Sequence, residues 1–275
     1  MRMQMIATSL SILLASSGST RAQENAEQPT GGPDVDSAVY EVLEQADQAI
    51  KNLKSISYNA FFEGTGSVAI WRPSTKGHVL LARTTGKSPD VRVTCVSRST
   101  RGLEGTVRNY DGVIRRNKVK VLNHEKREVI TGSHGLRAMG PAFDLIIREF
   151  NHPEPFQEEM QASVAILEGR AYVGDELCDV VSIDHHSGAH RRWYFSVQDH
   201  LPRRMIRMRF VNDVPGALVL TLTNVEVDVE LASDAFRPEN PEGYAQKRAS
   251  PSQGLNTMYL APEPKRDGGK RKPQE

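Results

Sequence analysis

The region from Trp193 to Leu231 constrains the fold most, because apolar and polar residues alternate along two long runs within it. An alternation with a period of two is typical of β-strands that bury one face. The second run changes parity between Thr223 and Asn224, which predicts a β-bulge and a sharply bent strand. Shorter alternating runs occur between residues 56 and 123 and between residues 163 and 184. The sequence therefore predicts a strongly curved antiparallel sheet of about ten strands.

Three other segments have the spacing of helices. From Val35 to Lys54, apolar residues recur at helical intervals, and Asp36 is suited to cap the helix. The apolar face of this helix consists of Val39, Val42, Leu43, Ala46, Ile50 and Leu53. Residues 142–150 follow Pro141 and predict a short, well-buried helix, and residues 156–161 predict a further helical turn. The predicted class is α+β, mainly antiparallel β, with the helices covering the concave face of the sheet.

The two ends of the chain differ in composition from the middle. Residues 1–22 have the form of a secretory signal peptide, because Arg2 precedes the apolar stretch Met5–Ala15 and small residues lead to Ala22. We expect residues 23–34 to be a disordered linker and residues 245–275 a disordered basic tail. The folded domain is then residues 35–244, and the signal peptide directs it to the periplasm. No later segment has the roughly 20 apolar residues that a transmembrane helix needs.

The charge balance argues against a protein that binds polyanions. The chain has 35 Lys and Arg residues and 34 Asp and Glu residues, so no net field attracts nucleic acid. The basic residues of the tail are Lys265, Arg266, Lys270, Arg271 and Lys272, without interleaved aromatic residues. We interpret the tail as solvated, with phosphate binding as the alternative, and expect no nucleic-acid partner.

The two cysteines leave two interpretations open. Cys95 and Cys178 both lie in strand-like runs. An oxidising compartment allows a disulfide between them. The other interpretation is a pair of buried free thiols, because spacing along the chain does not fix the distance between two Cα atoms.

The sequence lacks the familiar catalytic motifs. It contains no G-x-S-x-G elbow and no glycine-rich phosphate loop before a helix. The densest chemical cluster runs from Asp184 to Arg192, where His186 and His190 flank a short loop. Because the cluster falls short of a complete set of zinc ligands, we interpret it as a polar hairpin tip. We expect a protein that is not an enzyme and that binds neither a metal nor another cofactor.

The strand-like run from Arg203 to Phe210 separates charged from apolar residues. One parity contains Arg203, Arg207 and Arg209, and the other contains Ile206, Met208 and Phe210. This pattern predicts a basic outer face over an apolar inner face. The arginines are interpreted either as a docking patch for a headgroup or partner, or as partners of acids on the next strand. Those acids are Glu226, Asp228 and Glu230.

Several motifs follow one another in a recognisable order. They are an opening helix that ends in LKSISYNAFFEGTG, a central YDG, the strand GDELCDVVSID, a Trp-containing strand before DHLPRR, and the closing ASDAFRPENPEGY. In this order the chain resembles the LolA/LolB-like superfamily of periplasmic lipoprotein carriers, within its uncharacterised predicted periplasmic branch, from Val35 to Tyr244. The resemblance implies an incomplete β-barrel that is closed on one side by helices. It also implies an apolar cavity that holds the acyl chains of lipoproteins.

Large apolar side chains are available to line such a cavity. The candidates are Tyr58, Phe62, Ile70, Trp71, Phe143, Ile147, Phe150, Trp193 or Phe195, and Met208. They either leave room for an acyl chain or pack fully against one another. The first functional hypothesis is a periplasmic carrier whose partner is a lipid or an acylated protein. The alternative is an envelope module that docks other envelope proteins through its sheet or its basic tail.

Overall fold

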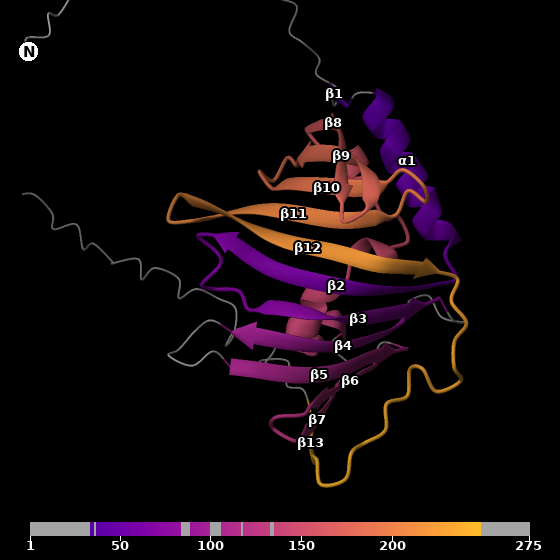
Figure 1. The fold of residues 1–275 in the computed structure, drawn as a ribbon, viewed down its shortest axis with the longest axis vertical. Coiled ribbons are helices and arrows are strands. Elements are labelled where there is room, and N and C mark those ends of the chain that lie inside the picture. The colour runs from indigo at the N-terminus through magenta and orange to yellow at the C-terminus, as the bar shows by residue number, and fades with distance from the viewer. Residues whose placement is uncertain are drawn as a thin grey trace, which may run out of the picture. The chain divides into compact units, whose positions relative to one another are not determined.

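An open, curled sheet of 13 strands forms the body of the protein in the computed structural model (Figure 1). The strand order is β1-β8-β9-β10-β11-β12-β2-β3-β4-β5-β6-β7-β13. Neighbouring strands are antiparallel except at the two edges, where β1 runs parallel to β8 and β13 runs parallel to β7. The sheet is therefore an incomplete barrel, which confirms the predicted fold class.

The structure describes residues 34–35, 37–83, 89–99, 106–116, 118–132 and 135–248. Its strands are β1 (Asp34–Val35), β2 (Ser55–Gly66), β3 (Ser74–Ala82), β4 (Asp90–Ser99), β5 (Thr106–Arg115), β6 (Lys118–Asn123), β7 (Glu128–Gly132), β8 (Val164–Val173), β9 (Glu176–Asp184), β10 (His190–Ser196), β11 (Pro202–Val211), β12 (Val214–Val227) and β13 (Ala245–Arg248). The predicted signal peptide, most of the predicted linker, the helix cap Asp36 and residues 249–275 lie outside the described residues.

The edges of the folded region differ slightly from the prediction. Residues 245–248, which were assigned to the disordered tail, form β13 along the edge strand β7. Asp34, which was assigned to the linker, pairs with Val164 in β8. Both additions are short parallel pairings at an edge, and the apolar periodicity of the sequence gives no signal for them.

The strand β12 bends where the sequence changes parity. Its register with β2 shifts between Thr223 and Glu226, and Asn224 takes a positive φ of 51°. This irregularity confirms the predicted bulge. Because a bulge increases the local twist and bend of a strand, it contributes to the curl of the long central pair β12–β2.

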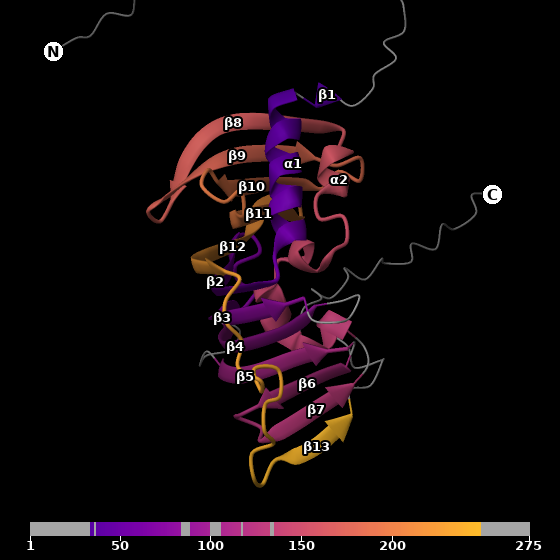
Figure 2. The same ribbon diagram turned by 90° about the vertical axis from the view of Figure 1, so that its right-hand side faces the viewer.

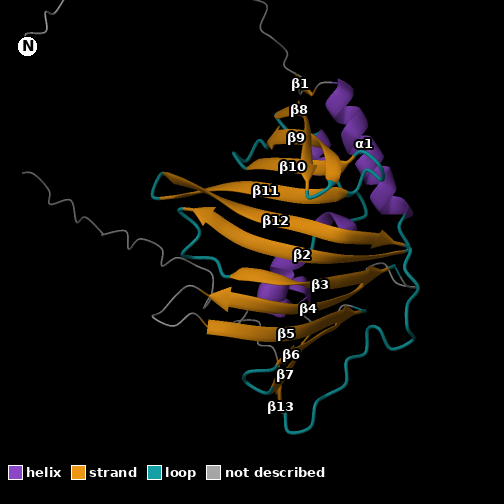
Figure 3. Ribbon diagram, viewed as in Figure 1, coloured by secondary structure: helices purple, strands orange, loops and turns teal. Residues whose placement is uncertain are grey.

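The helical segments lie on one side of the curled sheet (Figure 3). They are α1 (Ser37–Asn52), the 3₁₀ segments η1 (Gly135–Leu145) and η2 (Arg148–Asn151), and the short α2 (Gln157–Met160). Figure 2 shows α1 running across β8, β9, β10 and β11. Its buried apolar residues are Val39, Leu43, Ala46 and Ile50, with Val42 and Leu53 packed partly against the core. This face is the one that the sequence predicted.

Candidate functional site

The concave face of the central strands is apolar and buried. In β2 the residues Tyr58, Ala60 and Phe62 are buried, and they alternate with Asn59 and Phe61, which are exposed. On the neighbouring strands the same face continues with Val79, Val93, Leu220 and Leu222. This face is the interior of the incomplete barrel, and it is the part of the fold in which an apolar ligand could be shielded from water.

A segment that we call the cover, residues 135–161, closes this interior. It contains η1, η2 and α2, and its Met139 and Leu145 are fully buried. Met139 packs so closely on the sheet that a Cβ atom at Gly112 would lie 2.6 Å from the Met139 Cε atom. The hydroxyl of Tyr58 donates a hydrogen bond of 3.2 Å to the carbonyl oxygen of Leu145. Burial raises the pKa of Tyr58 well above its usual range, so this hydroxyl stays a donor.

Aromatic contacts fix both ends of the covered interior. The rings of Tyr58 and Phe150 are 5.8 Å apart between centroids. Phe156 packs edge-on against Trp193 at 5.4 Å and against Phe195 at 5.2 Å. Such pairs stabilise a core beyond the area that they bury. Phe156 therefore anchors the cover to the inner face of β10.

The cover has little stability of its own. Its 3₁₀ segment η1 is interrupted at Gly140, which has a φ of 59° and a ψ of −132° just before Pro141. The segments η2 and α2 span four residues each, and neither has a side-chain hydrogen bond at its N-cap. Helices this short are not stable alone, and uncapped ends leave backbone groups without helical partners. The cover is consequently held in place by its contacts with the sheet.

Opposite charges connect the cover to the sheet. The carboxylate of Glu159 in α2 accepts a hydrogen bond of 2.5 Å from Arg191 Nη1 of β10, and both side chains are largely buried. Glu158 lies 3.8 Å from the same guanidinium group. Glu149 of η2 and Asp144 of η1 interact electrostatically with Arg207 of β11. The acids belong to the cover and these arginines to the sheet.

Burial shifts the pKa values of this group of charges. Desolvation raises the pKa of Glu149, Glu159 and Asp144, and the pKa of Asp144 reaches about 6. Desolvation also lowers the pKa of the Arg207 guanidinium to about 10. One carboxylate oxygen of Glu149 and the Nε atom of Arg207 are buried without a hydrogen-bond partner. Closing the cover at neutral pH therefore holds charged groups in a poorly solvated place, which costs free energy.

This burial predicts that the fold gains stability as the pH falls. The pKa of Asp144 is raised in the folded state, so the folded protein binds this proton more tightly than the unfolded chain does. The free energy of unfolding should rise by on the order of 2 kcal/mol as the pH falls through about 6 towards 4. Urea unfolding at a series of pH values measures this change. Asp144→Asn should remove the part of the rise that is centred near pH 6 and leave the contributions of Glu149 and Glu159. An unchanged profile in this variant would contradict the assignment.

The predicted cavity residues divide into three groups. Tyr58, Phe62, Ile147, Phe150 and Trp193 lie together in the buried core, together with Phe195, and Phe143 packs partly against it. Ile70 and Trp71 lie instead in the turn between β2 and β3, where Ile70 is 62% exposed. Met208 lies on the other face of β11 from the buried Met205. The structure brings the first group together around the cover and does not add Ile70 or Met208 to it.

The predicted orientation of β11 is wrong. Arg203 and Met205 are buried on the inner face, and Arg207 follows with the same parity. Ile206, Met208 and Phe210 point to the outside, and Phe210 is strongly exposed. The inner arginines are tolerated because carboxylates of the cover face Arg207 and because Arg203 bonds to Glu176 and Asp199. The interpretation of these arginines as partners of Glu226, Asp228 and Glu230 is also wrong. The register of β11 with β12 extends from Val214 only as far as Thr221, which precedes all three acids.

The two cysteines are buried free thiols in the structure. Cys95 lies on β4 and Cys178 on β9, and five strands separate β4 from β9 in the sheet order. The disulfide interpretation is thus not the one that the structure shows. Burial raises the pKa of Cys95 to about 12 and that of Cys178 to about 11, so neither thiol is an activated nucleophile.

The histidine cluster forms the tip of the hairpin between β9 and β10, as a polar hairpin tip was predicted. His190 pairs with Asp184, and its Nδ1 atom lies 2.6 Å from Asp184 Oδ1. Within the described ranges, no three His, Cys, Asp or Glu side chains gather as metal ligands would. Nor does that part of the chain contain a helix with the length and hydropathy for crossing a bilayer.

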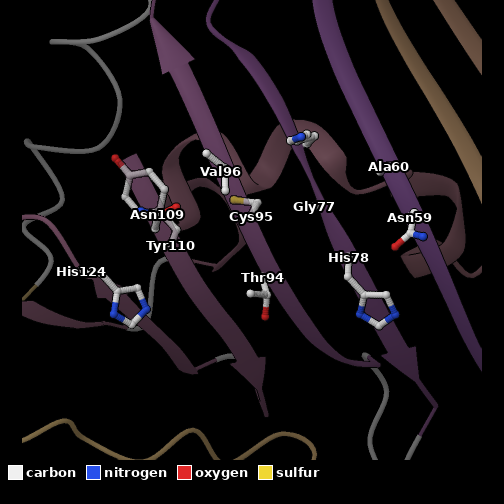
Figure 4. Close-up of a pocket in the computed structure, with 11 residues that line it drawn as sticks. Asn59, Ala60, Gly77, His78, Thr94, Cys95, Val96, Asn109, Tyr110 and His124 are labelled. Atoms are coloured by element: carbon white, nitrogen blue, oxygen red, sulfur yellow. The ribbon is translucent and has the colours of Figure 1, made fainter. Parts of the chain in front are cut away.

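A hollow lies on the outer face of the sheet (Figure 4). It is a groove of about 520 Å³ that crosses β2, β3, β4 and β5 to the end of β6. Its exposed side chains are polar, namely Asn59, Lys76, His78, Thr94, Asn109 and His124. His78 is already bonded to Ser57 at 2.9 Å, and His124 to Tyr244 at 2.9 Å. Polar groups rim the groove, but most of its lining is apolar. The covered interior differs in being shielded from water by the cover, which makes it the better candidate for an apolar ligand.

Sequence reasoning missed several residues of the site. It did not single out Phe156 or Met139, or the pairing of Arg191 with Glu159. The apolar character of residues 142–150 indicated a buried segment, but the partner of that segment lies far away in the sequence. Glutamates are usually exposed, and only the position of β10 explains why Glu159 is buried.

Comparison with known proteins finds similar folds but no similar sequence. No family model matches the chain, and no curated protein matches it. LprF from Mycobacterium bovis is similar over 74% of this chain and 99% of its own, at 9% identity and a TM-score of 0.49. The Mycobacterium tuberculosis lipoprotein LppX covers 72% of this chain and 100% of its own, at 10% identity and a TM-score of 0.45.

A third similar structure is the MucA/MucB complex of Pseudomonas aeruginosa. It covers 74% of this chain and 62% of its own, at 10% identity and a TM-score of 0.44. The fold itself follows from the strand order and the helical cover of this chain. They give it the half-barrel form that the resemblance to the LolA/LolB-like superfamily implies.

Proposed function

We propose that this protein is a non-enzymatic binding or carrier protein of the periplasm for a hydrophobic ligand. The ligand is a lipid or the acyl chain of a lipoprotein, held between the concave face of the sheet and the cover. The observation that carries the proposal is an apolar concave face closed by residues 135–161, whose helices are too short to be stable alone.

The packing of the interior indicates how a ligand would enter. Tyr58, Ile147 and Phe150 fill the space beneath the cover in this structure. An acyl chain must therefore displace part of the cover and take over its contacts with β2 and β10. The polar contacts of the cover with the sheet include the bond from Tyr58 to Leu145 and the charge interactions with Arg191, Arg207 and Arg72. Because opening the cover costs free energy, it lowers the apparent affinity of the protein for its ligand. A lower affinity suits a carrier that must also release the ligand.

The first test is mass spectrometry of organic extracts from protein purified gently out of the periplasm. We expect lipid or an acylated peptide at close to one molecule per chain. An extract without ligand, from protein that also fails to bind a fluorescent fatty acid, would contradict the proposal. That outcome would favour the alternative of an envelope module that docks other proteins.

Ile147→Asp should lower fatty-acid binding by at least about tenfold, because it places a carboxylate in the apolar interior. The matched control is Ile166→Asp on β8, next to the short edge strand β1, where the isoleucine is 54% exposed. The control should bind as the unchanged protein does. Circular dichroism checks that the sheet is intact in both variants. Equal binding by both variants, with the sheet intact, would argue against a ligand in the interior.

A further inference from the structure

We propose that one end of the sheet docks on the surface of a membrane that contains anionic lipid. This surface, which we call the apolar tip, consists of Ile70, Trp71, Phe210, Val211, Val214 and Pro215. It combines the β2–β3 turn with the β11–β12 hairpin, both at the left of Figure 1. The inference goes beyond the proposed binding of a ligand in the interior and does not depend on it.

Two turns that are far apart in the sequence are bonded together in the tip. The backbone N–H of Ser67 donates a hydrogen bond of 3.2 Å to Pro215 O, and the Ser67 hydroxyl donates one of 2.7 Å to Val214 O. Gly66 pairs with Gly216, and an added Cβ atom at either glycine would lie 2.7 Å from backbone of the other strand. Phe210 pairs with Pro215 and Val211 pairs with Val214, so the hairpin carries apolar side chains on both of its faces. The close approach of the strands holds the end of this hairpin beside the turn that carries Ile70 and Trp71.

The large side chains of the tip are unusually exposed for their type. Phe210 is 68% exposed, Ile70 62% and Val214 55%. Two further apolar residues, Trp71 and Val211, are half-buried beside them. A cluster of exposed large apolar residues of this kind marks an interaction site. Trp and Phe at the edge of an apolar surface suit the interface between headgroups and acyl chains.

The charges around the tip select an anionic lipid surface as its partner. Arg209 is exposed next to Phe210, and Arg148 of the cover is exposed and close enough to Arg207 to affect it electrostatically. The acid within the hairpin turn is Asp213. Of the acids near Arg207, Glu149 is buried and Asp144 is partly buried. An apolar surface edged with exposed arginines complements acyl chains beneath anionic headgroups.

The position of the tip relates it to the cover. Asp144 of η1 interacts electrostatically with Arg72 of the β2–β3 turn and with Arg207 of β11. The cover thus meets the sheet beside the two turns that form the tip. Docking through the tip would place the edge of the covered interior next to the membrane, where an apolar ligand can pass without crossing water.

Vesicle sedimentation of the full chain tests this proposal. The vesicles are phosphatidylethanolamine with phosphatidylglycerol, compared with neutral phosphatidylcholine. Phe210→Ser combined with Val214→Ser should lower the partition coefficient by at least about tenfold. The matched control is Tyr172→Ser on β8, which is also 68% exposed and should leave the partition coefficient unchanged. All variants share the same N-terminal segment and basic tail, so differences between them report on the tip.

A variant of Arg209 tests whether docking on anionic lipid requires a positive charge at the tip. Arg209→Gln should lower partitioning into vesicles with phosphatidylglycerol by about fivefold and leave partitioning into phosphatidylcholine unchanged. Tryptophan fluorescence supplies a local readout, because the chain has two tryptophans and Trp193 is fully buried in the core. Binding to vesicles should shift the emission of Trp71 to the blue, and Trp71→Phe should abolish the shift.

Three results would overturn the proposal. The first is equal partitioning of the double variant and the unchanged protein. The second is an equal loss in Tyr172→Ser. The third is self-association without vesicles that the double variant abolishes, which would assign the tip to a contact between two copies of the chain. Retention of extracted ligand by the double variant would show that the interior and the tip act separately.

Discussion

Phe156→Ala should lower the free energy of unfolding by about 3–5 kcal/mol, the largest effect that we expect from a single apolar substitution in the cover. Phe156 is fully buried and packs edge-on against both Trp193 and Phe195. Removing its ring leaves a cavity that the rigid sheet cannot close, and it also removes both aromatic contacts. Urea unfolding followed by tryptophan fluorescence measures the loss, since Trp193 reports on this contact.

The control for this prediction is Phe61→Ala. Phe61 is 40% exposed on the outer face of β2, so its truncation should cost less than about 1 kcal/mol. If the two alanine variants lose the same stability, Phe156 does not anchor the cover. Hydrogen exchange adds a spatial test, because Phe156→Ala should speed exchange in residues 157–161 before it affects the central strands β12 and β2.

Arg191→Met should cost about 3–5 kcal/mol at pH 8, because it leaves a buried carboxylate without its partner. Glu159 is almost completely buried and bonded to Arg191 at 2.5 Å. The uncompensated carboxylate should take up a proton more readily, so the loss should become smaller as the pH falls. Adding Glu159→Gln should recover part of the stability, since the double variant buries no net charge at this position.

The neighbouring Arg192 provides the matched control for Arg191. It bonds to Glu168 at 2.8 Å, but both side chains are partly exposed to solvent. Arg192→Met should therefore cost less than about 1 kcal/mol. An equal loss in the two methionine variants, or a loss in Arg191→Met that does not change with pH, would contradict the role of Arg191 in holding the cover.

Local patterns in the sequence predicted the elements of this fold well. The apolar face of α1 consists of the residues that its helical spacing indicated, and the parity change at Thr223 marked the irregularity in β12. Both features depend on neighbours within a few residues, which the sequence displays directly. The apolar run after Pro141 indicated a buried segment but not its form, because the helix predicted over residues 142–150 is instead divided between the 3₁₀ segments η1 and η2.

The sequence by itself determined which residues share a face, since alternation along a strand depends only on the backbone geometry of that strand. The sequence did not determine which face of β11 points to the interior, because that depends on which side chains of distant segments pack against the strand. Here the cover supplies Glu149 and Asp144 opposite Arg207, so an arginine faces inward and Phe210 faces solvent. The tertiary structure alone brought the two turns of the apolar tip together, because the backbone bonds of Ser67 join segments nearly 150 residues apart.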